Sequence, residues 1–144
     1  MKTLYIIEDE ETLRNLYPIY LKSALPGLEI IGSSGNGREA VSQCLDLKPD
    51  IVIVDIRLPE VSGLEILHVL KNKLQNTKVL ISSGVMDVNA IRIAIQGKVD
   101  GVVEKSGGME ELKKGVQALM EGRNYFNEDL YNQVLAFEAK KKGL

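Results

Sequence analysis

Short apolar runs alternate along the chain with longer segments in which apolar residues recur at helical spacing. The runs predict five strands: Thr3–Ile7, Leu28–Gly32, Ile51–Val54, Lys78–Ser82 and Gly101–Glu104. The third run is continuous Ile and Val, which is typical of a parallel strand buried on both faces. Helices are predicted between and after the strands, because apolar residues return every three or four positions, as they do over Glu11–Leu25.

Polar residues and prolines set the limits of the predicted helices. Asn36, Ser62 and Asp87 stand where a helix N-cap is expected. Pro26 should end the first helix, and Pro18 should kink it or shift its start. Strands that alternate with helices predict a parallel sheet covered by helices on both faces, and right-handed crossovers limit it to doubly wound forms.

The topology and the acidic residues point to the same place. A five-stranded doubly wound sheet commonly has the order 2-1-3-4-5, and its switch point lies between the first and third strands. Those two strands end at Glu8-Asp9 and at Asp55. Because ligands bind beyond the carboxyl ends of such strands, we predict one acidic site shared by these three side chains.

An acidic site of this kind favours metal and phosphoryl chemistry. Neighbouring carboxylates repel one another unless a cation neutralises them, and oxygen ligands in an incomplete shell suit Mg²⁺. A strand-end aspartate such as Asp55 can then act as a nucleophile and form an aspartyl phosphate. The phosphoryl oxygens need further donors. The fourth strand offers Ser82, Ser83 and Gly84 at its end, and Lys105 stands just past the end of the fifth.

The chain resembles the receiver domains of two-component response regulators over roughly residues 3–122. The resemblance rests on motifs in the family's order: Glu8-Asp9, Asp55 to Gly63, Ser83-Gly84 and Asp100 to Lys105. It implies the flavodoxin-like receiver fold and a signalling module rather than an enzyme. Such a module takes a phosphoryl group from a sensor histidine kinase and switches an output.

The resemblance also implies a role for each residue of the site. Asp55 would be the phosphoacceptor. Asp9 would bind Mg²⁺ directly together with Asp55, whereas Glu8 would bind it through water. The carbonyl of Arg57 would be a further metal ligand. Ser83 would be the switch hydroxyl, and Lys105 would pair with the phosphoryl group.

Further motifs resemble receivers of the NarL/LuxR type: Gly37 to Ala40, Lys48 to Asp50, and Glu104 to Ser106. Full-length members place a DNA-binding helix-turn-helix domain after a linker. We therefore expect a receiver domain over residues 1–124. Residues 125–144 would form a C-terminal helix or linker, with residues 139–143 as solvated linker. The chain is either truncated before its output domain, which we expect, or a natural single-domain regulator.

Three positions depart from the receiver pattern. Glu8 stands where aspartate is usual, and Gly84 replaces the usual alanine. Val102 stands where the family's switch aromatic, Tyr or Phe, is expected. No ring can therefore rotate at that position behind Ser83, and a degenerate receiver that works unphosphorylated as a protein-binding adaptor stays open as an alternative. An aspartyl phosphatase would need a second aspartate at the position of Arg57, so the sequence argues against that class of enzyme.

Composition limits the partners. The net charge of -2 makes this segment a poor nucleic-acid binder, so DNA would be reached only through the output domain. No apolar run approaches the ~18 residues of a membrane span, and we expect no membrane contact and a cytoplasmic location. We also expect a homodimer on phosphorylation.

One surface for such a contact is the predicted helix that carries Ile91, Ile93 and Ile95. At least one of these isoleucines should be exposed there, because residues two apart on a helix cannot face the same way.

Overall fold

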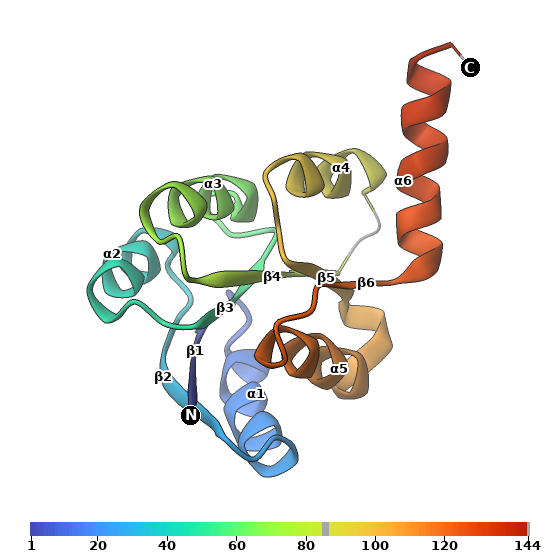
Figure 1. Ribbon diagram of the computed structural model, residues 1–144. Coiled ribbons are helices and arrows are strands. Elements are labelled where there is room, and N and C mark those ends of the chain that lie inside the picture. Colours follow the sequence, from blue (N-terminus) through green and yellow to red (C-terminus); the bar gives the residue numbers. More distant parts are fainter. Residues whose placement is uncertain (85–86, 144) are drawn as a thin grey trace.

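A parallel sheet separates the helices into two layers (Figure 1). Its strands are β1 (Lys2–Ile7), β2 (Leu28–Ser34), β3 (Ile51–Asp55), β4 (Lys78–Ser83), β5 (Gly101–Glu104) and β6 (Tyr125–Phe126). They lie in the order β2-β1-β3-β4-β5-β6, and every neighbouring pair is parallel. The structure is a computed structural model that describes residues 1–84 and 87–143.

The sixth strand corrects the prediction of a five-stranded sheet. The order 2-1-3-4-5 is confirmed for the strands that were predicted, and β6 extends the sheet beyond β5. In register, Tyr125 lies beside Gly101 and Phe126 beside Val102. A strand of two residues is too short to produce an alternating apolar pattern, so the sequence carried no periodic signal for it.

Helices cover both faces of the sheet, as predicted. They are α1 (Glu11–Ala24), α2 (Gly37–Leu47), α3 (Gly63–Lys73), α4 (Val88–Gln96), α5 (Gly108–Met120) and α6 (Glu128–Lys141), with a short 3₁₀ turn η1 (Lys105–Gly107) before α5. At the predicted helix starts, a backbone N–H donates a hydrogen bond to each of the capping side chains, Asn36, Ser62 and Asp87. Pro18 lies inside α1, which begins at Glu11, so the helix start is not shifted.

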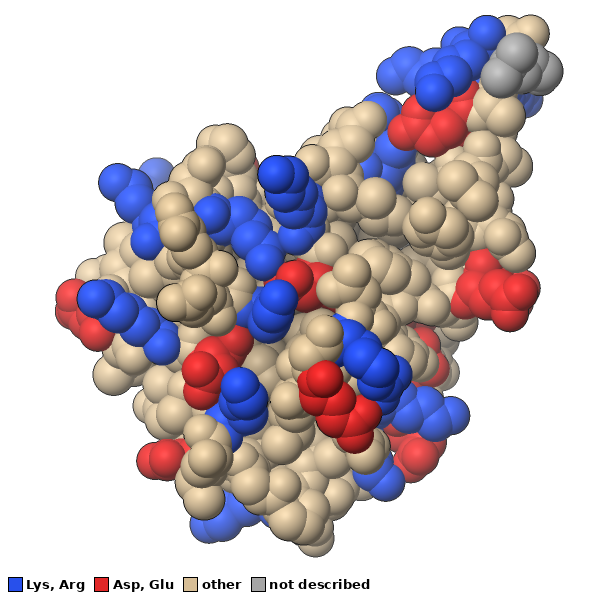
Figure 2. All heavy atoms as spheres, in the orientation of Figure 1, with Lys and Arg blue, Asp and Glu red and all other residues tan. Residues whose placement is uncertain are grey.

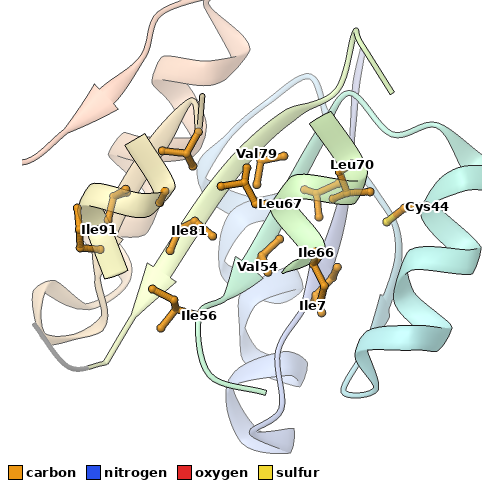
Figure 3. Packing of buried hydrophobic residues seen from close by; sticks show 14 of the residues in the cluster. Ile7, Cys44, Val54, Ile56, Ile66, Leu67, Leu70, Val79, Ile81 and Ile91 are labelled. Carbon is orange, nitrogen blue, oxygen red and sulfur yellow. The ribbon is translucent and has the colours of Figure 1, made fainter. Parts of the chain in front are cut away.

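Two apolar clusters hold the layers together. In the first, Ile91 of α4 and Leu67 of α3 are directed toward sheet residues such as Val54 and Ile81 (Figure 3). The second cluster lies between the sheet and the pair α1 and α5. Every residue of β3 is buried, which confirms the expectation of a strand covered on both faces. Cys44 of α2 is buried in the first cluster, and burial raises the pKa of its thiol to about 12.

The segment after β6 forms a helix that packs on α4. Leu130 and Val134 of α6 are buried in the first apolar cluster. Arg92 of α4 reaches Glu138 at 3.8 Å and lies 5.6 Å from the ring centre of Phe137. The helix continues to Lys141, so the expectation of a solvated linker from residue 139 is wrong for residues 139–141.

The isoleucines of α4 divide as expected. Ile91 is buried, whereas Ile93 is 40% exposed. None of the helices in the described part of the chain combines the length and the apolar character needed to span a bilayer.

Candidate functional site

Two buried carboxylates lie at the switch point of the sheet. Asp55 is the last residue of β3 and is 6% exposed, and Glu8 follows β1 directly and is 1% exposed. Because Ile7 and Val54 are partners in the ladder between these strands, the next residue of each strand lies at the same level. The sheet register therefore brings the acidic ends of the first and third strands together, as predicted.

The ammonium group of Lys105 joins these two carboxylates. Its Nζ lies 2.9 Å from Glu8 Oε1 and 3.1 Å from Asp55 Oδ2. Lys105 follows β5 directly, as the first residue of η1, so the crossover into α5 directs its side chain back across the end of the sheet. One cation thus lies between two carboxylates that would otherwise repel each other.

The environment shifts the pKa values of both partners. Burial raises the pKa of Glu8, the neighbouring charge of Asp55 adds to the rise, and Lys105 opposes it. For Lys105, burial alone would lower the pKa, but the contacts with Glu8 and Asp55 outweigh it and the pKa lies above its ordinary value. The charged form of the lysine is therefore stabilised by the two carboxylates.

The backbone around Asp55 is held by the start of α3. The Arg57 N–H donates to Asp55 Oδ1 at 3.1 Å, and the Gly63 N–H donates to the Ile56 carbonyl at 3.0 Å. A Cβ atom on Gly63 would lie 2.4 Å from the Asp55 carbonyl oxygen and 2.7 Å from Ile56 Cα. Only glycine lets the helix approach this closely, so Gly63 fixes the loop that follows Asp55.

The end of β4 lies beside Lys105. Ser83 is the last residue of β4, is 4% exposed and pairs in register with Glu104. A Cβ atom on the next residue, Gly84, would lie 3.6 Å from Lys105 Cδ, which is an ordinary van der Waals distance. The exchange of the family's usual alanine for glycine here therefore relieves no clash.

The other predicted metal ligands are Asp9 and the carbonyl of Arg57. Asp9 is exposed next to Glu8, and the backbone of Arg57 lies beside Asp55, to which its N–H donates. Within residues 1–84 and 87–143, no group of three or more His, Cys, Asp or Glu side chains is arranged to hold a metal ion. The structure thus brings Glu8, Asp55 and Lys105 together, and the ligand roles of Asp9 and Arg57 stay predictions.

The donor chemistry of the site nevertheless suits Mg²⁺. Glu8 Oε1 is buried, and it meets the Lys105 ammonium without the alignment of a hydrogen bond, so it keeps acceptor capacity. The available donors are carboxylate and carbonyl oxygens, which Mg²⁺ prefers. The ligand roles remain predictions.

Two side chains of α1 that were not predicted contribute to the site. Arg14 Nη1 donates to the carbonyl oxygens of Glu8 at 2.9 Å and of Asp9 at 3.2 Å, which fixes the acidic loop. Tyr17 is 5% exposed and lines a cavity of about 220 Å³ that Lys105 also borders. Burial raises the pKa of Tyr17 to about 12, with Glu8 adding to the rise. The sequence did offer a signal for Arg14, because a basic residue one turn into the first helix can reach the acidic loop before it.

Comparisons with known proteins point to one family. A family model described as the response regulator receiver domain matches residues 4–117. A protein-glutamate methylesterase/protein-glutamine glutaminase of Archaeoglobus fulgidus is 32% identical over 120 residues, which cover 80% of this chain and 33% of that protein. The response regulator protein VraR of Staphylococcus aureus is 25% identical over 130 residues, covering 90% of this chain and 61% of VraR. The chain therefore spans only part of the length of these relatives.

Solved structures show the same fold. A LuxR-family two-component response regulator from an Aurantimonas species has a TM-score of 0.87 at 21% identity, covering 96% of this chain and 99% of that one. A LuxR-family DNA-binding response regulator from Staphylococcus aureus has a TM-score of 0.78 at 29% identity, covering 83% of this chain and 98% of that one.

Proposed function

Because the chain belongs to the response regulator receiver domain family, and solved structures similar to it include LuxR-family response regulators, we propose that Asp55 accepts a phosphoryl group from a sensor histidine kinase. One observation carries the proposal: the Asp55 carboxylate ends a buried strand with the Lys105 ammonium 3.1 Å from Oδ2 and the Glu8 carboxylate beside it. A nucleophile and a cation for the incoming group thus occupy one place.

The chain's own residues have separate tasks in this transfer. An Asp55 carboxylate oxygen forms the new bond to phosphorus, while the bond to the donor's imidazole nitrogen breaks. Lys105 exchanges part of its contact with Asp55 for a contact with a phosphoryl oxygen. The hydroxyl of Ser83 would donate to another phosphoryl oxygen, and Arg14 holds the Glu8–Asp9 loop in place.

Mg²⁺ would supply the remaining positive charge for the phosphoryl oxygens when bound. Its proposed holders are Asp9 and Asp55, with Glu8 through a water molecule and the carbonyl of Arg57.

Labelling with acetyl phosphate tests the proposal. We expect one phosphoryl group per chain by mass spectrometry in the presence of Mg²⁺ or Mn²⁺, and none in Asp55→Asn. Asp46→Asn is the matched control, because Asp46 is exposed on α2 and the same charge is removed. Labelling that persists in Asp55→Asn, or without a divalent metal, would contradict the assignment.

Ser83→Ala should weaken the response to phosphorylation without changing Mg²⁺ affinity. The change removes one charge-assisted hydrogen bond to the phosphoryl group, a contact of about 1.5–3 kcal/mol, but no metal ligand. The shifts of backbone amide resonances on phosphorylation measure the response, and titration with Mg²⁺ measures the affinity. Ser42→Ala, on the exposed surface of α2, serves as control. Loss of Mg²⁺ binding in Ser83→Ala would show that this serine has another role.

The output and the whole protein's partners are also proposals. We propose that residues 1–124 form the receiver and that residues 125–144 lead to a DNA-binding domain that regulates transcription. The S. aureus structure is titled a DNA-binding response regulator, and this chain covers 61% of VraR. A cytoplasmic location, a homodimer that forms on phosphorylation through the α4 region, and the absence of any enzymatic activity on a separate substrate belong to the same proposal.

A protein-binding adaptor that works unphosphorylated is the second candidate. The observation in its favour is Val102, which is buried beside Phe126 of β6 and offers no rotating ring to report on Ser83. The labelling experiment separates the two candidates, because the adaptor need not accept a phosphoryl group at Asp55.

A further inference from the structure

Helix α6 carries large apolar residues beyond the face that packs on α4, and among the described residues these side chains are exposed. Successive residues turn by roughly 100° around a helix, which places Leu130, Val134 and Phe137 on the side that packs on α4. Tyr131 and Leu135 are centred roughly 110° around the helix from that side and are 43% and 51% exposed, although the Tyr131 ring also meets the ring of Phe126, with centroids 6.1 Å apart. A helix whose apolar residues extend beyond one stripe is normally covered on more than one side.

Figure 2 shows α6 standing out as an arm with basic side chains at its tip. Within roughly 40° of Leu135 around the helix lie Glu128, Tyr131, Ala139 and Lys142, the last of which caps the C-terminal end of the helix. We call these five residues the outer stripe. It runs from an acidic end through a large apolar centre to a small residue and a basic end.

We propose that the outer stripe pairs with the outer stripe of a second copy of this chain, with the two α6 helices antiparallel and the two-fold axis at Leu135. Glu128 and Lys142 are both seven residues from Leu135, so each then meets the other residue of the second copy. Tyr131 and Ala139 are both four residues from Leu135, so a large side chain meets a small one. The stripe is therefore complementary to itself, as an isologous contact requires.

A parallel pairing has no such complementarity. It would place Glu128 against Glu128 and Lys142 against Lys142, and like charges directly opposite each other destabilise a helix pair. It would also set the Tyr131 side chains against each other and leave the two Ala139 residues facing a gap. The distribution of charge and size along the stripe selects the antiparallel arrangement.

The contact is short, and it does not involve the phosphorylation site. A helix of 14 residues is about 21 Å long, so two such helices bury less than the ~1,200 Å² of a standard stable interface. The dimer is therefore weak. The outer stripe contains no residue of the Asp55 site, so the pairing forms in the unphosphorylated chain and in Asp55→Asn as well.

Sedimentation of the 144-residue chain over a range of concentrations tests the pairing. We expect a reversible dimer whose dissociation constant rises at least tenfold in Leu135→Asp. Leu47→Asp is the matched control, because Leu47 is 48% exposed on α2, and it should leave the dissociation constant unchanged. A wild-type chain that stays monomeric up to millimolar concentration would overturn the proposal. That result is expected if the outer stripe packs against another domain instead of a second copy. Equal masses for Leu135→Asp and wild type would also overturn it.

Charge reversal and cross-linking test the direction of the helices. Glu128→Lys and Lys142→Glu should each weaken the dimer, and the double variant should restore it. Under a copper-phenanthroline oxidant, Leu135→Cys should form a disulfide with its copy, whereas Glu128→Cys, far from the two-fold axis, should not. The native Cys44 is buried and does not compete. Self-cross-linking of Glu128→Cys as efficient as that of Leu135→Cys would show parallel helices and refute the proposal.

Discussion

Gly63→Ala is expected to lower the free energy of unfolding by about 3 kcal/mol, because overpacking against rigid atoms costs roughly 1–3 kcal/mol and occasionally more. The new Cβ atom would lie 2.4 Å from the carbonyl oxygen of Asp55 and 2.7 Å from Ile56 Cα, and neither is the end of a flexible side chain. The start of α3 must then retreat and lose the hydrogen bond from the Gly63 N–H to Ile56. Unfolding in urea, followed by circular dichroism, measures the change.

The same substitution should slow the labelling of Asp55, because its backbone must move when α3 retreats. Gly84→Ala provides the matched control, since among the described residues its Cβ atom would meet Lys105 Cδ at an ordinary 3.6 Å. That variant should keep the stability within about 0.5 kcal/mol of the wild type, as is usual where no contact is strained. Equal stabilities for Gly63→Ala and Gly84→Ala would mean that the close approach at Asp55 is not a constraint.

The position of the site could be predicted from the sequence because it depends on strand order. The uninterrupted apolar run of β3 identified a buried parallel strand, and its end placed Asp55 beyond the carboxyl edge. The preferred topology then set Glu8 beside it, and the register of β1 and β3 produces this arrangement. These are properties of main-chain geometry, which short sequence patterns encode well.

The contacts inside the site could not be predicted in the same way. The bridge from Lys105 to Glu8 and Asp55 depends on where a long flexible side chain settles after η1. Asp9 lies next to Glu8 in sequence, yet Asp9 is exposed whereas Glu8 is buried, a difference that adjacency in sequence does not predict. Side-chain direction at a strand end is fixed by tertiary packing rather than by local pattern.

The C-terminal segment was the other limit of the sequence interpretation. The spacing of Leu130, Val134 and Phe137 indicated a helix, but its lysine-rich end resembled a linker. Leu130 and Val134 are buried in the core cluster, and Phe137 lies over Arg92 of α4, so tertiary packing stabilises the helix. Most helical stability in proteins comes from such packing rather than from intrinsic propensity.

Lys105→Met should destabilise the protein at neutral pH by about 3 kcal/mol, since removing one partner of a buried ion pair typically costs 3–5 kcal/mol and Lys105 keeps some solvent contact. Methionine fills a similar volume, so the loss reports the missing charge between Glu8 and Asp55. The matched control is Lys78→Met. The contact of Lys78 with Asp100 is long, at 3.8 Å, and the Lys78 side chain is 47% exposed. The loss of unfolding free energy should therefore be below about 1 kcal/mol.

The pH dependence of this loss identifies its cause. Burial raises the pKa of Glu8 in the folded chain, and without Lys105, which opposes that rise, the pKa should lie higher still. A carboxyl whose folded pKa is raised contributes its full stability below its unfolded pKa of about 4.3, where it is protonated in both states. That contribution is lost as the pH rises through the folded pKa. The difference in unfolding free energy between Lys105→Met and wild type should therefore be small near pH 4.5 and large at pH 7 to 8.

Mg²⁺ should recover part of the stability of Lys105→Met at pH 8, because a divalent cation can replace the missing ammonium between the carboxylates. Urea unfolding at a series of pH values, with and without Mg²⁺, measures both effects. A loss that is the same at every pH would mean that Lys105 stabilises the fold by packing and not by its charge.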